Sequence, residues 1–440
     1  MRRWLLSILF LSGALLLGWG MSALRFRPPK PPNVAFIVLD ALRADKIDGR
    51  RGATSILPGL HSFFLQSVAF KHAITPCTWT RPAMASLFTS TYLETHGVKH
   101  GDGMRNGEGV PGDVLPERVE TMAEYFRAHG YTTACVQTNL NLTKQNGFAQ
   151  GFLAGNFHFA ESEAAGKVTR QAVKFLDKLT PPFFLYAHYL DPHFPYTPPK
   201  NALSYFTSPP PPEPGDPVDA ENACFNENDF LVDQQYVAAG IRERRRFPPI
   251  SDAGKEYARY LYDCKIRYMD AQLCLLLDSL RLRFPDTIIV ILADHGEEFW
   301  EHKGMGHGTT MFSEQLDVPF CIQAPSLVPH PFNDTVSTID LLPTLAGLLG
   351  FAPRAQWQGK DLFDPRRSFD EPLFSSTYGI APKDPFHVSA VLQRQKKCVL
   401  NRETGKTMLF DEDNDPADSH NIIGDDRGFA NTLRATLPAH

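Results

Sequence analysis

Two carboxylates and a histidine follow short apolar runs of this sequence. Asp40 comes directly after the run Asn33 to Leu39, and the pair Asp294-His295 closely follows the run 287–292. Ligands of open α/β sheets bind beyond the carboxyl ends of the strands. If both runs are strands, these side chains reach one sheet edge and offer oxygen and nitrogen to a divalent cation. A single Asp after a strand is more often a helix cap, so the joint placement carries the prediction.

A hydroxyl side chain precedes a predicted helix in the stretch TWTRPAMASLFT. Pro82 suits the first turn of a helix that continues through Ala85 and Leu87. Thr80 then lies just before the helix start. Free backbone N–H groups and the positive end of the helix dipole make that position suitable for an anion. The alternative is that Thr80 only caps the helix.

Two further histidines occupy rigid or glycine-rich loops after predicted strands. His193 lies in DPHFPY, and His307 lies in GMGHG. A histidine in such a loop can serve an anion, a second metal ion or a leaving group, although most loop histidines are simply solvated. Both are therefore candidate catalytic residues.

The elements that must position these residues alternate along the chain. Helical patterns and apolar runs of strand length follow one another, which is typical of an α/β fold with a mostly parallel sheet. The predicted strands are 33–39, 131–137, 183–188 and 287–292, and the predicted helices are 121–129, 168–179 and 257–280. The fold class predicted from the pattern is α/β, with a mixed, mostly parallel sheet flanked by helices.

Composition limits the class of protein. The chain has 440 residues, 43% of them hydrophobic, and a net charge of -5. No basic stripe indicates nucleic acid as a partner, so an anionic substrate must be held by local groups. The seven cysteines form no CxxC pair and no dense framework, which argues against a disulfide scaffold while leaving one or two bridges open.

The N-terminus predicts export. Arg2 and Arg3 precede an uncharged stretch from Trp4 to Leu24, about long enough to span a bilayer as a helix. We interpret it as a retained membrane anchor; a cleaved signal peptide and a buried core helix are the alternatives. Both leading readings export the rest of the chain. The predicted division is an anchor or signal segment with linker at 1–32, a catalytic domain at 33–365 and a small C-terminal subdomain at 366–440. A proline-rich stretch at 208–217 reads as a surface insertion.

An ordered series of motifs resembles the sulfatase-like family of the alkaline phosphatase superfamily. NVAFIVLDALRAD resembles the family's opening strand with its first metal carboxylate, and the stretch from Leu57 to Val98 resembles its nucleophile region. The remaining matches follow in the family's order: FFLYAHYLDPHFPY, VILADHGEEFWEH, GHGTTMFSEQLDVPF, STIDLLPTLAGLLG and GKTMLFDEDNDPADSHNI. The resemblance covers roughly residues 33–425, and the order of the motifs is more specific than any one of them.

The resemblance implies an alkaline-phosphatase-like fold and a role for each candidate. Asp40, Asp294 and His295 would be metal ligands together with the nucleophile. His193 and His307 would contact the substrate, the leaving group or a second metal ion. Lys303 would contact the substrate anion.

Two registers compete for the nucleophile. Sulfatases carry C-x-P-x-R, whose cysteine is converted to formylglycine. Cys77 keeps the spacing to Arg81 but has tryptophan where proline belongs. Placing Thr80 at the nucleophile position puts Pro82 on the motif's proline and Leu87-Phe88-Thr89 on its ending, with Met84 in place of the arginine. The downstream spacing favours Thr80, which resembles the phospho-transferring members of the family.

These observations predict a metal-dependent hydrolase or transferase acting on phosphate or sulfate esters through a metal-bound Thr80. The cation would be Zn²⁺, Mn²⁺, Ca²⁺ or Mg²⁺. The substrate would be an anionic ester of a glycan, a lipid headgroup or a small molecule, and the membrane a partner through the N-terminal helix. The catalytic domain would lie outside the cytoplasm, anchored, secreted or periplasmic. The alternatives are a formylglycine sulfatase that uses Cys77 and a non-catalytic descendant that binds an anion or glycan.

Overall fold

The computed structural model describes residues 30–48, 56–105, 108–160, 164–211, 213, 250–379 and 386–438. The predicted hydrophobic helix at 4–24 lies outside these residues, as does part of the proline-rich stretch at 208–217. Among the described residues, no helix is both long enough and apolar enough to span a bilayer. The chain divides into two compact units, residues 1–31 and 32–440, and all the elements named here belong to the second.

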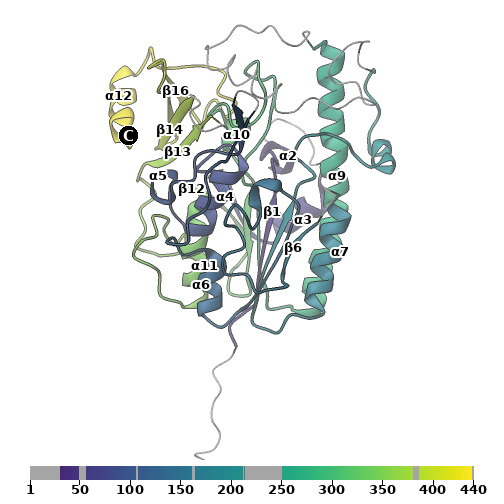
Figure 1. Cartoon of the computed structure of the whole chain (residues 1–440). Coiled ribbons are helices and arrows are strands. Elements are labelled where there is room, and N and C mark those ends of the chain that lie inside the picture. Colours follow the sequence, from purple (N-terminus) through teal and green to yellow (C-terminus); the bar gives the residue numbers. More distant parts are fainter. Residues whose placement is uncertain are drawn as a thin grey trace, which may run out of the picture. The chain divides into compact units, whose positions relative to one another are not determined.

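The centre of this unit is an eight-stranded sheet with the strand order β12-β2-β11-β8-β1-β7-β5-β6 (Figure 1). In that order the strands are His330–Ser337, Val68–Ile74, Phe320–Gln323, Ile288–Leu292, Val34–Leu39, Phe183–Tyr189, Thr132–Gln137 and Phe157–Phe159. Strand β11 runs antiparallel to its neighbours β8 and β2, and every other pairing in the sheet is parallel. The predicted mixed, mostly parallel sheet is confirmed.

Strands β1, β7 and β8 occupy the middle of the sheet. All their residues are buried, as expected for parallel strands with both faces covered. The register pairs Leu39 with Tyr189 and Val38 with Leu292. The carboxyl ends of the three strands therefore lie level with one another, at the edge where Asp40 follows β1.

Helices cover both faces of the sheet, with α7 and α9 packed together on one face and α4, α6 and α11 on the other (Figure 1). The α-helices are α2 Asp45–Asp48, α3 Pro58–Leu65, α4 Thr80–Thr89, α5 Leu93–His96, α6 Met122–Ala128, α7 Ala165–Leu176, α9 Asp252–Arg283, α10 Ser313–Leu316, α11 Leu341–Leu349 and α12 Arg427–Thr436. Short 3₁₀ helices are η1 Leu140–Leu142, η2 Lys200–Tyr205 and η3 Thr338–Asp340.

Two hairpins and a second sheet complete the described elements. The hairpins pair β3 (Gly103–Arg105) with β4 (Glu108–Val110) and β9 (Glu298–Phe299) with β10 (Met305–Gly306). The second sheet is antiparallel in chain order: β13 Leu373–Tyr378, β14 His387–Gln393, β15 Lys396–Asn401 and β16 Thr407–Asp411. Its buried side chains pack with Met311 and Leu316 of the larger part. A domain boundary at 365/366 stays a prediction.

Local sequence explains where the predicted helices begin and end. Thr121 and Glu124 form a capping box at the start of α6, and Gly130 follows its end with a φ of +83°. Helix α9 begins at Asp252, five residues before the predicted start at Tyr257, because the Ser251 side chain accepts a hydrogen bond from the backbone of Gly254.

Candidate active site

The predicted cluster forms at the carboxyl edge of the middle strands. Asp40 follows β1, and Asp294 and His295 follow β8; all three side chains are fully buried. The Nε2 atom of His295 lies 3.5 Å from Asp40 Oδ1 and 3.6 Å from Asp294 Oδ2. The structure therefore brings together the three residues that the strand ends indicated.

Thr80 contacts this cluster through its hydroxyl. Its Oγ1 lies 3.2 Å from His295 Nε2. The other ring nitrogen, Nδ1, lies 2.9 Å from the Gly296 carbonyl. Because a carbonyl can only accept, Nδ1 carries the ring proton, and the lone pair of Nε2 faces the hydroxyl and the two carboxylates.

The same atoms fit a divalent cation. Asp40 Oδ1 and Asp294 Oδ2 are buried and have no hydrogen-bond partner among the described residues. A buried carboxylate oxygen without a partner is costly unless a cation or a proton completes it. Two such oxygens, an imidazole lone pair and a hydroxyl form a ligand set suited to a divalent metal.

The pKa values of the two carboxylates shift in opposite directions. Burial and then the negative charge of Asp40 raise the pKa of Asp294 well above its ordinary value. Burial would also raise the pKa of Asp40, but the hydrogen bond from His188 and the charges of nearby histidines outweigh it and lower that pKa. A bound cation would relieve the repulsion that keeps a proton on the pair.

Two residues of this site escaped the sequence analysis, namely His188 and Asn139. His188, on β7, places Nε2 2.8 Å from Asp40 Oδ2. Asn139, after β5, donates from Nδ2 to Asp40 Oδ2 at 2.5 Å and to Thr80 Oγ1 at 3.4 Å. One ligand atom each of Asp40, His188 and Asp294 lies within 4.8 Å of the other two. These three residues could hold a metal ion.

Thr80 is the first residue of helix α4 rather than the residue before it. The N-cap is Trp79, whose backbone is extended with φ -153° and ψ 159°, and whose side chain makes no capping hydrogen bond. The helix therefore begins one residue earlier than predicted, and Pro82 lies in its first turn as expected. The Thr80 hydroxyl is directed to His295 and Asn139 instead of capping the helix.

The alternative nucleophile has a different environment. Cys77 is buried in an apolar cluster with Trp79, Ala83, Leu93 and Tyr378, and burial raises the pKa of its thiol to about 12. Arg81, the arginine of the Cys77 register, donates to Asp102 at 2.6 Å. Met84 belongs to the main hydrophobic core. Neither the thiol nor Arg81 is bonded to the carboxylate pair.

The two loop histidines lie beside His295. The ring centroid of His307 is 4.2 Å from that of His295 and 4.8 Å from that of His193. His307 Nδ1 lies 2.8 Å from Glu297 Oε1, and His193 Nδ1 contacts the Phe194 carbonyl. Glu297 is a further residue that sequence reasoning missed, since nothing in the string DHGEE indicates which carboxylate faces a histidine ten positions later.

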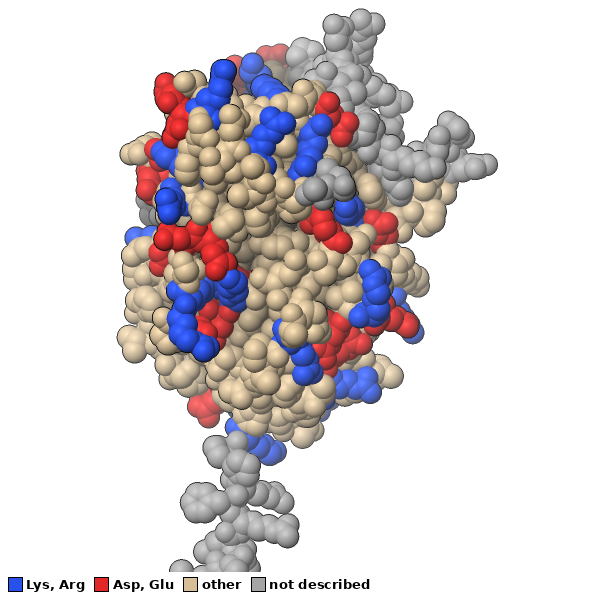
Figure 2. Space-filling view, turned by 90° about the vertical axis from the view of Figure 1, so that its left-hand side faces the viewer, with Lys and Arg blue, Asp and Glu red and all other residues tan. Residues whose placement is uncertain are grey.

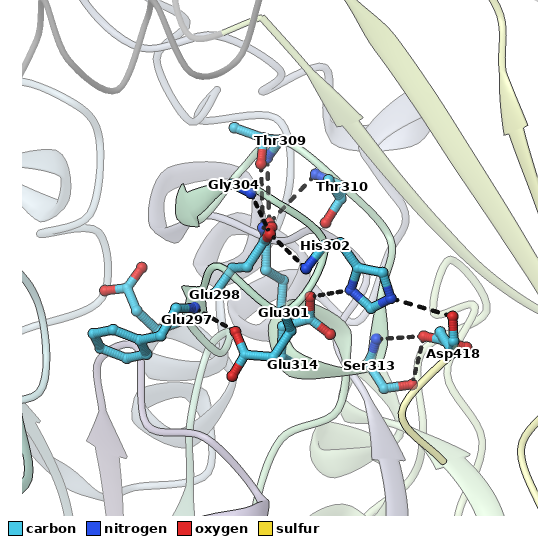
Figure 3. A network of polar contacts seen from close by, with 12 residues as sticks. Glu297, Glu298, Glu301, His302, Gly304, Thr309, Thr310, Ser313, Glu314 and Asp418 are labelled. Carbon is cyan, nitrogen blue, oxygen red and sulfur yellow. Dashed lines mark hydrogen bonds and ion pairs between the residues drawn. The ribbon is translucent and has the colours of Figure 1, made fainter. Parts of the chain in front are cut away.

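A polar network holds the loop that carries His307 (Figure 3). Glu298 accepts from the backbone of His302 and Gly304 and from the Gln315 side chain. His302 is bonded to Glu314 at 2.7 Å and to the Asp418 carbonyl at 3.2 Å. This network connects the hairpin β9–β10 to α10 and to the C-terminal segment.

Lys303 does not join this cluster. It lies exposed in the turn between β9 and β10 with a φ of +75°. Within the part of the chain that the structure describes, its side chain forms no hydrogen bond or ion pair with Asp40, Thr80 or His307. Its role as an anion contact stays a prediction.

The face shown in Figure 2 carries charges of both signs. Lys and Arg side chains lie interspersed with Asp and Glu on the face shown in Figure 2. An anionic substrate would therefore be held chiefly by groups at the site. A hydroxyl beside a ligand set for a divalent cation is an arrangement that can carry out nucleophilic attack on an ester.

Comparisons with known proteins identify the family and the fold of this chain. The model of the Sulfatase family matches residues 32–351. The uncharacterized sulfatase YidJ of Escherichia coli is 24% identical over 90% of this chain and 84% of its own. The structure of BT1596, a 2-O GAG sulfatase, has a TM-score of 0.71 at 20% identity, with 93% and 91% of the two chains covered. Phosphonate monoester hydrolase of Agrobacterium radiobacter also gives 0.71, at 19% identity, with 92% and 94% covered. These two structural likenesses show the fold alone.

The chain belongs to the sulfatase family. It is a sulfatase-like ester hydrolase.

Proposed function

We propose that this protein hydrolyses sulfate esters with Thr80 as the nucleophile. One observation carries the proposal: Thr80 Oγ1 lies 3.2 Å from His295 Nε2, beside two buried carboxylate oxygens without hydrogen-bond partners among the described residues. Cys77 is enclosed by apolar side chains and is expected to remain an unmodified thiol.

Each residue has a role in this proposal. Asp40, Asp294, His295 and Thr80 would hold a divalent cation. When bound, the cation would lower the pKa of the Thr80 hydroxyl and offset the charge of the ester. The Thr80 oxygen, its proton released to solvent, forms a bond to sulfur while the bond to the leaving oxygen breaks. His307 or His193 gives that oxygen a proton.

The second half of the cycle distinguishes Thr80 from a formylglycine. In the proposed intermediate, the sulfate is bonded through Oγ1 to the Cβ atom of Thr80. That carbon bears no second hydroxyl that could expel the sulfate. A water molecule must attack the sulfur, and the Thr80–sulfur bond breaks to regenerate the hydroxyl. An alcohol in place of water would make the enzyme a transferase, and the same centre could act on a phosphate ester.

A sulfated glycan is the proposed substrate class. The support is the match to the Sulfatase family. The two proteins of like fold set the compounds to test: sulfated glycans after the 2-O GAG sulfatase, and phosphorus esters after the phosphonate monoester hydrolase. We further propose that the enzyme works outside the cytoplasm, because the apolar stretch at 4–24 follows two arginines. Membrane fractionation and N-terminal sequencing of the mature protein test that location.

The test compares Thr80→Ala with Cys77→Ala on aryl sulfates, sulfated sugars, phosphodiesters and phosphonates. Loss of at least about 10³-fold in kcat/KM is expected for Thr80→Ala, since the covalent step disappears. Cys77→Ala should retain most of the activity.

Mass spectrometry of the peptide spanning residues 72–104 provides an independent check. An unmodified Cys77 is expected. A modified Cys77, together with activity lost only in Cys77→Ala, would overturn the Thr80 assignment. A protein that is free of metal and inert on every ester would support a non-catalytic, anion-binding descendant.

A further inference from the structure

His188 is a buried histidine beside the cluster, and the proposed reaction gives it no role. It lies on β7, between β1 and β5 in the sheet, and its side chain is fully buried. Its position beside Asp40 allows two functions. It can be a metal ligand through Nε2, or it can donate a hydrogen bond to Asp40.

The neighbouring Tyr186 decides between these functions. Residues 186 and 188 point to the same face of the strand, and Tyr186 Oη lies 2.6 Å from His188 Nδ1. Among the described residues, His188 is the only hydrogen-bond partner of this buried hydroxyl. A buried hydroxyl proton without an acceptor is costly, so Tyr186 donates and His188 Nδ1 accepts. The ring proton of neutral His188 then resides on Nε2.

Nε2–H therefore donates to Asp40 Oδ2, at 2.8 Å. Asn139 Nδ2 donates to the same oxygen at 2.5 Å. The other oxygen, Oδ1, is the buried atom without a partner, 3.5 Å from His295 Nε2. One oxygen of Asp40 is thus fixed by two donors, and the other is aimed at the cluster.

We infer that Tyr186 and His188 form a positioning pair that orients Asp40 for the metal, with His188 acting as a donor and not as a ligand. The inference rests on the metal centre of the proposed function. Partners of this kind orient the ligands of metal sites, and their loss typically weakens metal binding by roughly 10–100-fold.

The test measures Co²⁺ binding to the full-length, chelator-stripped protein, by calorimetry and by the visible d–d spectrum. For His188→Leu we expect a Kd for Co²⁺ raised by roughly 10–100-fold, with the spectrum of the saturated protein unchanged. Tyr186→Phe should weaken binding less, because Nε2 can still donate in one tautomer. His188→Gln keeps an N–H donor and should recover part of the affinity.

Tyr189→Phe is the matched control. It also removes a buried tyrosine hydroxyl from β7, but that hydroxyl is bonded to Thr169 at 2.8 Å and lies on the opposite face of the strand. Its Kd should equal that of the wild type. A thermal melt of each metal-free variant separates weakened binding from loss of the fold.

Two results overturn the inference while leaving the proposed function standing. One is an unchanged Kd in His188→Leu and Tyr186→Phe. The other is a saturated spectrum in His188→Leu that shows a lost nitrogen ligand, which would make His188 a ligand. A wild-type protein that binds no Co²⁺ would remove the metal centre, and with it both the proposed function and this inference.

Discussion

Three imidazole rings gather at this site, and the ring of His307 packs against those of His295 and His193. The hydrogen bonds of His295 and His307 suit the two rings to different roles. His295 turns the lone pair of Nε2 toward Thr80 and the carboxylates, whereas His307 has its Nδ1 bonded to Glu297. Proton exchange between His307 and a leaving group therefore falls to Nε2. We propose His307, whose ring is bonded to the Glu297 carboxylate, as the general acid.

The exchange of His307 for asparagine tests that role. Loss of a general acid typically slows a reaction about 10²–10⁴-fold. We expect such a loss in kcat/KM for a sugar sulfate, whose leaving oxygen needs a proton, and a much smaller loss for 4-nitrophenyl sulfate. The exposed His330, exchanged in the same way, is the control. Equal losses on both substrates would contradict the assignment.

Single residues also show what the sequence could predict. Asp40, Asp294 and His295 were identified because each follows a strand, and Thr80 because Pro82 indicated a helix start. His188 was not, since in the run FFLYAHYL a polar residue inside a buried strand looks like any other core position. Asn139 resembles an ordinary turn residue in TNLN. Its partners, Asp40 and Thr80, are 99 and 59 positions away, and only the folded chain brings them together.

At the scale of elements, the loop after β10 approaches the start of α4 closely. Gly308 has a φ of +75°, and a Cβ atom placed on it would lie 3.2 Å from the Cβ of Trp79. Trp79 is the N-cap of α4 and precedes Thr80. A side chain at 308 would thus both strain the loop and press on the segment that places Thr80.

Gly308→Ala and Gly405→Ala form a matched pair for this contact. Gly405 has a φ of +70°, but a Cβ there would meet no atom within 4 Å. Each substitution should lower the free energy of unfolding by about 1–2 kcal/mol, the cost of a left-handed alanine. Only Gly308→Ala should also lower kcat. Urea unfolding and steady-state kinetics measure the two effects, and full activity in Gly308→Ala would refute the role of the contact.

The hairpin β9–β10 should give the protein a pH-dependent stability. Burial and then the charge of Glu314 raise the pKa of Glu298 from 4.5 to about 7. The folded state then binds more protons than the unfolded state between these values, so stability falls as pH rises from 4.5 to 7. The contribution, on the order of 3 kcal/mol, is present at low pH and lost above about pH 7.

Urea unfolding of the wild type and Glu298→Gln across this pH range isolates that contribution. The difference in unfolding free energy between the two proteins should shrink or change sign as pH rises from 4.5 to 7. Other carboxylates titrate in both proteins and cancel in the comparison. A difference independent of pH would show that Glu298 keeps an ordinary pKa in the folded state.

At the scale of the whole molecule, buried charges join the C-terminal sheet to the part of the fold that carries the candidate site. Lys397 of β15 is fully buried and pairs with Asp418 at 2.7 Å and Glu412 at 2.9 Å. It also donates to the Ser313 hydroxyl at 2.8 Å, and Ser313 begins α10. The loop that bears His307 therefore depends on residues more than 80 positions further along the chain.

Lys397→Met tests how strongly this connection stabilises the fold. It leaves the buried Asp418 and Glu412 without their cation, and breaking a buried ion pair in this way costs about 3–5 kcal/mol. Lys396→Met, one residue earlier, removes a partly exposed pair with Asp411 and should cost at most about 1 kcal/mol. Equal free energies of unfolding for the two variants would contradict the role of Lys397.

The hydrogen bonds that join Ser313 to Lys397 and Asp418 also bear on how the protein folds during its synthesis. A ribosome releases the N-terminal strands first, and domains tend to fold as they emerge. Here the residues that steady the loop bearing His307 are translated more than 80 positions after Ser313. A nascent chain can thus expose every strand of its main sheet before the partners of Ser313 have emerged, so this loop is expected to become fixed later than the sheet that carries the candidate site.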